Sequence, residues 1–142
     1  MTETNPPLAI RRIVETCINV SGIARAQLFY EKLFGFEVME HDDRFCALRV
    51  GPDVLLLFTQ GASDTPIPVK GGLIPPHNTT GSGHFAFAVS AAELNRWRDV
   101  LTEQAIQIES EINWERGGRS IYFRDPDGNL LELVTPGTWA NY

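Results

Sequence analysis

The chain has 142 residues, 43% hydrophobic and 21% charged, which is the composition of one folded domain with an apolar core. Its formal net charge of -6 argues against a protein that follows the phosphates of a nucleic acid. No apolar run approaches the ~20 residues of a membrane-spanning helix, and residues 1–7 do not resemble a secretory signal, so we expect a cytoplasmic protein that binds neither membranes nor nucleic acids.

The first predicted strand covers residues 13–20 and has two different faces. Alternate side chains from Val14 to Val20 are β-branched and suit packing under a helix. The opposite face carries Glu15, Cys17 and Asn19. We expect Cys17 and Cys46 to be buried, reduced thiols in a cytoplasmic protein, with a single disulfide as the alternative.

A helix is predicted for residues 21–34, where apolar side chains recur at helical spacing and Gly35 supplies the stop. Three strand-like segments follow, near residues 36–40, 44–50 and 54–59. The first unit therefore spans residues 12–60 and reads β-α-β-β-β.

The segment 61–82 is rich in Gly, Pro, Ser and Thr and is predicted to be a long loop. Loops of this length in compact domains are usually functional or mobile. Its folding decides the volume and polarity of any neighbouring pocket.

A second unit, residues 83–135, repeats the pattern of the first. Its strand at residues 83–89 ends in valine and serine as the first one does, and Ser90 with Glu93 forms a capping box for a helix at residues 90–104. Strands are expected near residues 106–112, 119–124 and 130–134. The sequence thus predicts an α+β fold, a single domain over residues 1–142, in which two β-α-β-β-β modules curl around one cavity.

The separation from Glu15 to His84 equals the separation from Val20 to Val89. His84 therefore holds in the second unit the position that Glu15 holds in the first. The face of His84 continues with the small residues Ala86 and Ala88. A strand face of small residues leaves room, which favours a cavity over a dry core.

Glu132 is the remaining unusual residue, because it lies between Leu131 and Leu133 in a segment that should be buried. A tight turn with the sequence Asp-Pro-Asp-Gly, residues 125–128, precedes it. A buried carboxylate costs several kcal/mol unless it is paired or bound to a metal. An arginine, from Arg44, Arg119 or Arg124, is one candidate partner and a metal ion is the other.

Two carboxylates and an imidazole, from Glu15, His84 and Glu132, would suit one divalent ion such as Mn, Fe, Ni, Co or Zn. His84 as a core imidazole bonded to a backbone carbonyl is the structural alternative. Arg44 and Arg119 hold matching repeat positions and are candidate anion-binding residues for a substrate, with surface ion pairs as their alternative. Trp114 is a candidate rim residue over the cavity, or part of an ordinary hairpin loop.

These features resemble the vicinal oxygen chelate superfamily of glyoxalases, extradiol dioxygenases, and fosfomycin- and bleomycin-resistance proteins. The resemblance covers residues 13–137 and rests on three segments, Ala26 to Phe36, Gly83 to Phe87 and Phe123 to Glu132. It implies a homodimer with a site near the interface, a small-molecule substrate bound through neighbouring oxygens, and metal ligands at Glu15, His84 and Glu132.

Two departures from the family pattern bear on the activity. The first ligand position is commonly His but is Glu15 here, which can be a ligand or a catalytic base, and Glu132 can also shift between these roles. The strand at residues 54–58 lacks the acid that glyoxalase I uses. The sequence leaves isomerase or lyase, dioxygenase and thiol-transferase chemistry open. A metal-free drug-binding protein of the bleomycin-resistance type is the non-enzymatic alternative.

Overall fold

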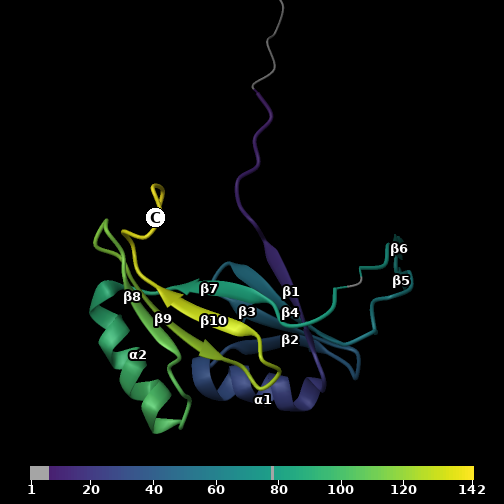
Figure 1. Cartoon of the computed structure of the whole chain (residues 1–142). Helices are drawn as coiled ribbons and strands as arrows, with labels where there is room; N and C mark the ends of the chain where they lie inside the picture. Colours follow the sequence, from purple (N-terminus) through teal and green to yellow (C-terminus); the bar gives the residue numbers. More distant parts are fainter. Residues whose placement is uncertain (1–6, 78) are drawn as a thin grey trace, which may run out of the picture.

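The two predicted repeats fold as two β-α-β-β-β modules in the computed structural model, which describes residues 7–77 and 79–142 (Figure 1). The first module consists of β1 (Glu15–Val20), α1 (Ile23–Phe34), β2 (Glu37–His41), β3 (Phe45–Val50) and β4 (Asp53–Thr59). The second consists of β7 (His84–Ala88), α2 (Ala91–Glu103), β8 (Ser110–Asn113), β9 (Arg119–Arg124) and β10 (Leu130–Val134).

Each module forms a four-stranded mixed sheet with the same topology. The strand orders are β1-β4-β3-β2 and β7-β10-β9-β8, so β1 and β7 hold equivalent edge positions. In both sheets this edge strand runs parallel to its neighbour, and the other pairings are antiparallel. The predicted α+β architecture is confirmed.

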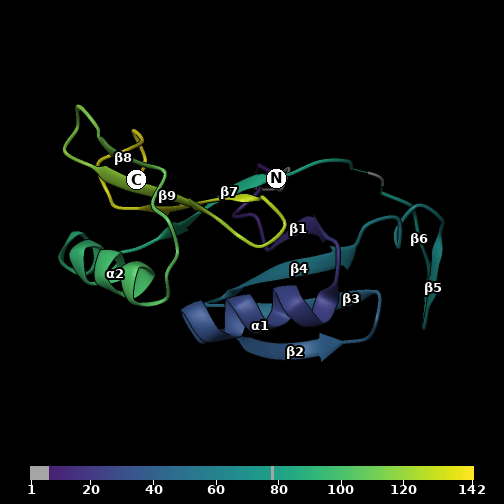
Figure 2. The same cartoon turned by 60° about the horizontal axis from the view of Figure 1, so that its bottom comes forward.

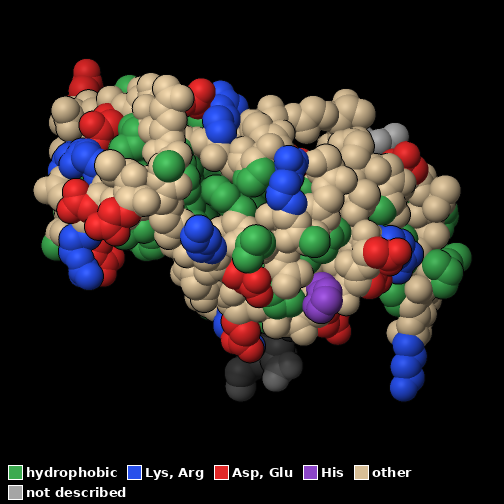
Figure 3. All heavy atoms as spheres, turned by 90° about the horizontal axis from the view of Figure 1, so that it is seen from below, with side chains coloured by type: hydrophobic (Ala, Val, Ile, Leu, Met, Phe, Trp, Pro, Cys, Tyr) green, Lys and Arg blue, Asp and Glu red, His purple; other side chains and the backbone are tan. Residues whose placement is uncertain are grey.

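Both helices lie on one side of the two sheets, and a shared apolar core connects them (Figure 2). Phe34 of α1 links the two modules within this core. Its ring centroid lies 4.9 Å from that of Phe87 of β7 and 5.7 Å from that of Trp97 of α2. Seen from the helix side, charged side chains of both signs surround a central patch of apolar atoms (Figure 3). The opposite face of each sheet is left without a helix.

The tight turn between β9 and β10 joins the two modules. Asp127 accepts hydrogen bonds from the backbone N–H and hydroxyl of Ser21 and lies 2.9 Å from the guanidinium of Arg25. Asp125 accepts from the hydroxyl of Tyr30 at 2.8 Å. Burial and the charge of Asp125 raise the pKa of that phenol well above its usual range. We call residues 125–129 the Asp-Pro turn.

The segment between the modules differs from its prediction as a loop. It contains a small hairpin, β5 (Ile67–Val69) and β6 (Gly72–Ile74), which stands beside the first sheet (Figures 1 and 2). Gly71 and Gly72 have φ values of 111° and 159°, so glycine permits this turn. Short strands containing Pro68 carry little strand signal in the sequence.

Element boundaries otherwise follow the sequence within a few residues. The Ser90 hydroxyl accepts from the backbone N–H of Glu93 at 3.2 Å, which confirms this cap. The expected strand at residues 106–112 begins only at Ser110. The expectation that both thiols are buried is wrong for Cys17, which is exposed on the helix-free face, whereas Cys46 is buried, and both are free. No helix among the described residues is long and apolar enough to cross a membrane.

Candidate functional site

Strand register collects the polar side chains of the second sheet on its helix-free face. Glu132 of β10 lies opposite Tyr122 of β9 and Ala86 of β7, and His84 lies opposite Leu130. Paired residues project to the same side of a sheet. Ala86 is exposed, and its small side chain adds little bulk beside Glu132.

His84 and Glu132 face each other on this side of the sheet. Nε2 of His84 lies 3.3 Å from Oε2 of Glu132, and Nδ1 lies 2.9 Å from the carbonyl oxygen of Leu130. A carbonyl only accepts, so Nδ1 is the donor in this contact, and Nε2 is the ring nitrogen that faces the carboxylate. The histidine is about half exposed, whereas Glu132 is 7% exposed.

The second carboxylate oxygen of Glu132 is held by a chain of two donors. The hydroxyl of Ser120 donates to Oε1 of Glu132 at 2.5 Å and accepts from the indole N–H of Trp114 at 2.8 Å. Ser120 is 1% exposed, so the carboxylate has a fixed, buried support. Trp114 itself lies at the edge of the site and is 37% exposed, consistent with a rim position.

Arginine is not the partner of Glu132 among the described contacts. Arg124 is paired with Glu109 at 2.7 Å, and Arg44 lies 3.4 Å from Asp42. Arg119 donates its backbone N–H to Thr135, and its side chain is half-buried. The ion-pair alternative that the sequence left open for Glu132 is therefore wrong.

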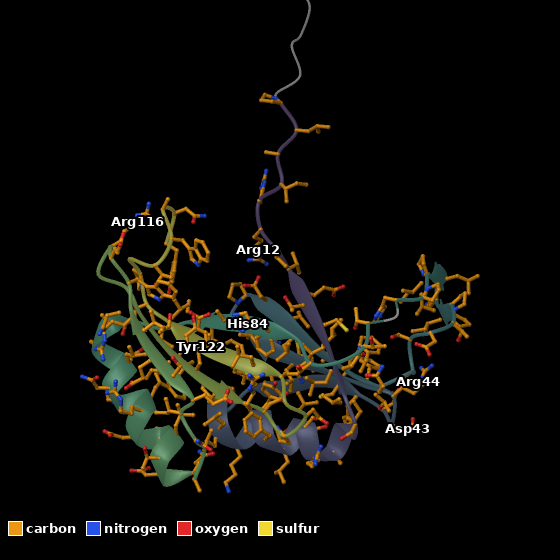
Figure 4. The ribbon with its side chains drawn as sticks, in the orientation of Figure 1. Arg12, Asp43, Arg44, His84, Arg116 and Tyr122 are labelled. Atoms are coloured by element: carbon orange, nitrogen blue, oxygen red, sulfur yellow. The ribbon has the colours of Figure 1, made fainter. Side chains whose placement is uncertain are left out.

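Tyr122 is a site residue that the sequence reasoning missed. Its ring centroid lies 6.1 Å from that of His84, and the two side chains lie side by side on the second sheet (Figure 4). Burial, followed by the negative charge of Glu132, raises the pKa of the Tyr122 phenol. The phenol is therefore a neutral hydrogen-bond donor at neutral pH. The hairpin register across the Asp-Pro turn is the signal that could have found it.

Glu15 lies apart from this pair, exposed on the helix-free face of the first sheet. Together with Arg44 it lines a separate cavity of about 320 Å³, and Figure 4 shows Arg44 at the far end of the first sheet from His84. The described part of the chain holds no group of three His, Cys, Asp or Glu side chains close enough together to hold a metal ion. One chain thus brings together two of the three predicted ligands.

The chemistry of the paired residues fits a divalent ion. A histidine whose Nδ1–H donates to a backbone carbonyl is the usual arrangement of a metal-bound imidazole, since the carbonyl fixes the ring and its tautomer. Nε2 of His84 and Oε2 of Glu132 lie 3.3 Å apart, a separation at which both can bind one ion. Nitrogen and oxygen donors with positions left for further ligands suit Mn, Fe, Co, Ni or Zn.

Comparison with known proteins gives a family match over most of the chain. A family model described as the glyoxalase/bleomycin resistance protein/dioxygenase superfamily matches residues 12–133. The crystal structure of a lactoylglutathione lyase from Agrobacterium tumefaciens superposes with a TM-score of 0.82 at 30% identity, covering 96% of this chain and 99% of the other.

The curated relatives include metallothiol transferases named FosB. The protein from Shouchella clausii is 40% identical over 65 residues, a local match that covers 40% of each chain. The protein from Staphylococcus saprophyticus is 27% identical over 128 residues, covering 89% of this chain and 78% of the relative.

Proposed function

Because the chain belongs to the glyoxalase/bleomycin resistance protein/dioxygenase superfamily, we propose that it is an enzyme that binds a small molecule through two neighbouring oxygens on one divalent ion. His84 and Glu132 supply two ligands of this ion, and Glu15 from a second copy of the chain supplies the third. The lyase and metallothiol transferase names of its relatives support an enzyme of this superfamily, and they leave the reaction type open.

The observation that carries this proposal is the orientation of the His84–Glu132 pair. The Leu130 carbonyl holds the imidazole through Nδ1, and the Ser120 hydroxyl holds the carboxylate through Oε1. In each residue, the atom that makes this hydrogen bond is not the one that faces the other residue. The remaining atoms, Nε2 and Oε2, lie 3.3 Å apart at a position where the His84 side chain is about half exposed. A protein that only sequesters an apolar compound has no need of such fixed donors, which argues against the metal-free alternative.

A homodimer completes the site in this proposal. The helix-free faces of both sheets look to the same side of the molecule and expose His84, Ala86 and Ala88 on one sheet and Glu15 on the other. A two-fold axis on this side lays the first sheet of one copy over the second sheet of the other. Glu15 of each copy then faces the His84–Glu132 pair of its partner.

The chain's own residues have separate tasks in this site. The ion, when bound, acts as a Lewis acid that stabilises negative charge on the substrate oxygens. Tyr122 keeps its phenolic proton and donates a hydrogen bond to a substrate oxygen beside His84. Glu15 sits on an exposed strand end, where it would serve either as a ligand of the ion or as the base that accepts a proton from the substrate, as glyoxalase-type chemistry requires.

Two free thiols support a reducing compartment, and we place the protein in the cytoplasm on that ground.

Elemental analysis tests the metal site. The purified protein is loaded with Mn, Ni or Zn, desalted and measured beside the His84→Ala, Glu132→Ala double variant. We expect about one ion per chain in the parent protein and a loss of that ion in the variant. His77→Ala is the matched control, since His77 contacts Phe58 and not the pair, and it should keep the ion. Stoichiometric metal that survives the double substitution would contradict the proposal.

A further inference from the structure

The cavity beside Glu15 has an apolar floor made by the first sheet. Phe45 of β3 and Phe58 of β4 lie opposite each other, with ring centroids 5.9 Å apart and planes inclined by 27°. Leu56 of β4 lies opposite Cys17 of β1, so its side chain is on the face that carries Glu15. The candidate ligand therefore stands at the border of a stacked aromatic surface. We call this space of about 320 Å³ the first-sheet cavity.

The β5–β6 hairpin forms the other wall of the first-sheet cavity. Ile67 and Ile74 lie opposite each other, Val69 follows on the same face of the hairpin, and all three line the cavity. The base of the hairpin is tied down, because the Ser63 hydroxyl donates to the carbonyl of His77 at 2.7 Å. Aliphatic side chains thus face the aromatic floor.

The base of the hairpin also touches that floor directly. The ring of His77 packs edge-on against the ring of Phe58, with the two ring centroids 4.9 Å apart. This contact joins the segment between the modules to the strand that lines the cavity. Residues from the segment that was predicted to be a loop therefore form this wall of the first-sheet cavity.

Charge in the first-sheet cavity does not favour an anionic substrate group. Arg44 is its only lining cation among the described residues, and Asp42 already lies 3.4 Å from that guanidinium. Glu15 and Glu40 add two carboxylates to the lining. A phosphonate or carboxylate group would need several convergent cations to replace its water.

We propose that the substrate carries an uncharged, phenyl-sized apolar group next to its metal-bound oxygens, and that this group fills the first-sheet cavity. The inference rests on the proposed function, since Glu15 is what connects the cavity to the ion. The stacked rings of Phe45 and Phe58 favour an aromatic group over a linear chain, because aromatic pairs gain from edge and offset contacts beyond the burial of apolar area. The cavity volume lies at the small end of ligand pockets, which suits one ring.

Two hydroxamates test this substrate class. Acetohydroxamate and benzohydroxamate chelate a divalent ion through the same two oxygens and differ in a methyl against a phenyl group. Both are titrated into the nickel-loaded, full-length protein by calorimetry. We expect benzohydroxamate to bind about tenfold more tightly or better, an effect of the size that burying a ring brings. Phosphonoacetohydroxamate, which carries an anion instead of the ring, should not gain this advantage.

Variants locate the effect in the cavity. Phe58→Ala should reduce the preference for the phenyl compound to less than threefold. Phe58→Leu, which keeps apolar volume and protects folding, should give an intermediate preference. Phe29→Ala, on α1, is the matched control and should keep the parent preference.

The outcomes separate this inference from the function on which it rests. Equal binding of the two hydroxamates, tighter binding of the phosphonate compound, or a phenyl preference that survives both Phe58 variants would overturn the apolar substrate class while leaving the metal site intact. Failure of all three probes to bind the nickel-loaded protein would contradict the metal-dependent function, and the inference with it.

Discussion

At the scale of single residues, Ser120 explains how Glu132 is tolerated in an apolar strand. The carboxylate is buried beside Leu131 and Leu133, yet the Ser120 hydroxyl satisfies one of its oxygens at 2.5 Å. Trp114 in turn satisfies the serine at 2.8 Å. The other carboxylate oxygen, Oε2, faces His84, so it is the oxygen of Glu132 that remains for binding a cation.

Removal of the Ser120 hydroxyl should therefore weaken metal binding. We expect Ser120→Ala to raise the dissociation constant for Mn²⁺ by about tenfold or more, the usual effect of losing a group that orients a ligand. Calorimetric titration of the apo protein measures it. Ser120→Thr retains the hydroxyl and should stay close to the parent value. An unchanged affinity in Ser120→Ala would show that Glu132 does not depend on this support.

The sequence predicted His84 and Glu132 of this site, with Trp114 as a rim candidate, and missed Ser120 and Tyr122 for physical reasons. Alternation along the strands places His84 on the small-residue face, and the burial of Glu132 follows from its neighbours. Ser120 and Tyr122 became visible only through the pairing of β9 with β10. Cys17 was expected to be buried because its strand is apolar, but its face has no helix to cover it.

At the scale of elements, the Asp-Pro turn does more than reverse the chain. Gly128 has a φ of 82° and donates its N–H to the Asp125 carbonyl at 3.1 Å, as the turn chemistry predicts. The sequence did not indicate that Asp127 would reach the start of α1, because that contact joins residues about a hundred positions apart. The turn thus fixes β10, and Glu132 on it, relative to the first module.

Loss of this contact should destabilise the fold. The Asp127 side chain is 7% exposed and accepts from Ser21 and Arg25. We expect Asp127→Asn to lower the free energy of unfolding by about 1–2 kcal/mol, since hydrogen bonds to a charged group are lost or weakened. Urea unfolding followed by circular dichroism measures the change.

Asp99→Asn is the control for that experiment. Asp99 is exposed on α2, and its substitution should change the free energy of unfolding by less than about 0.5 kcal/mol. Equal stability of the Asp127 variant and this control would contradict a role for the turn in joining the modules.

At the scale of the whole molecule, the repeat explains both the fold and the separation of the candidate ligands. Two matching modules were predictable because each carries its own periodicity, cap and turn signals. Their placement relative to each other was not, because it depends on packing such as that of Phe34 against Phe87 and Trp97. That packing puts both helices on one side and leaves both site-bearing faces uncovered on the other.

A site shared between two copies makes a specific prediction for mixed dimers. Glu15→Ala alone and the His84→Ala, Glu132→Ala variant alone should each lose metal binding. After the two are unfolded and refolded together, half of the dimers should be mixed, and each mixed dimer contains one site with all three ligands. About a quarter of all sites should therefore regain metal. A site within one chain would give no recovery, because every chain lacks at least one ligand.

The most direct test of the central claim is anomalous diffraction from crystals grown with zinc. The claim is that His84, Glu132 and Glu15 of a second copy hold one divalent ion. It predicts one anomalous peak per chain, about 2.0–2.2 Å from Nε2 of His84 and from a carboxylate oxygen of both glutamates. Crystals that contain zinc elsewhere, with no peak between His84 and Glu132, would contradict it.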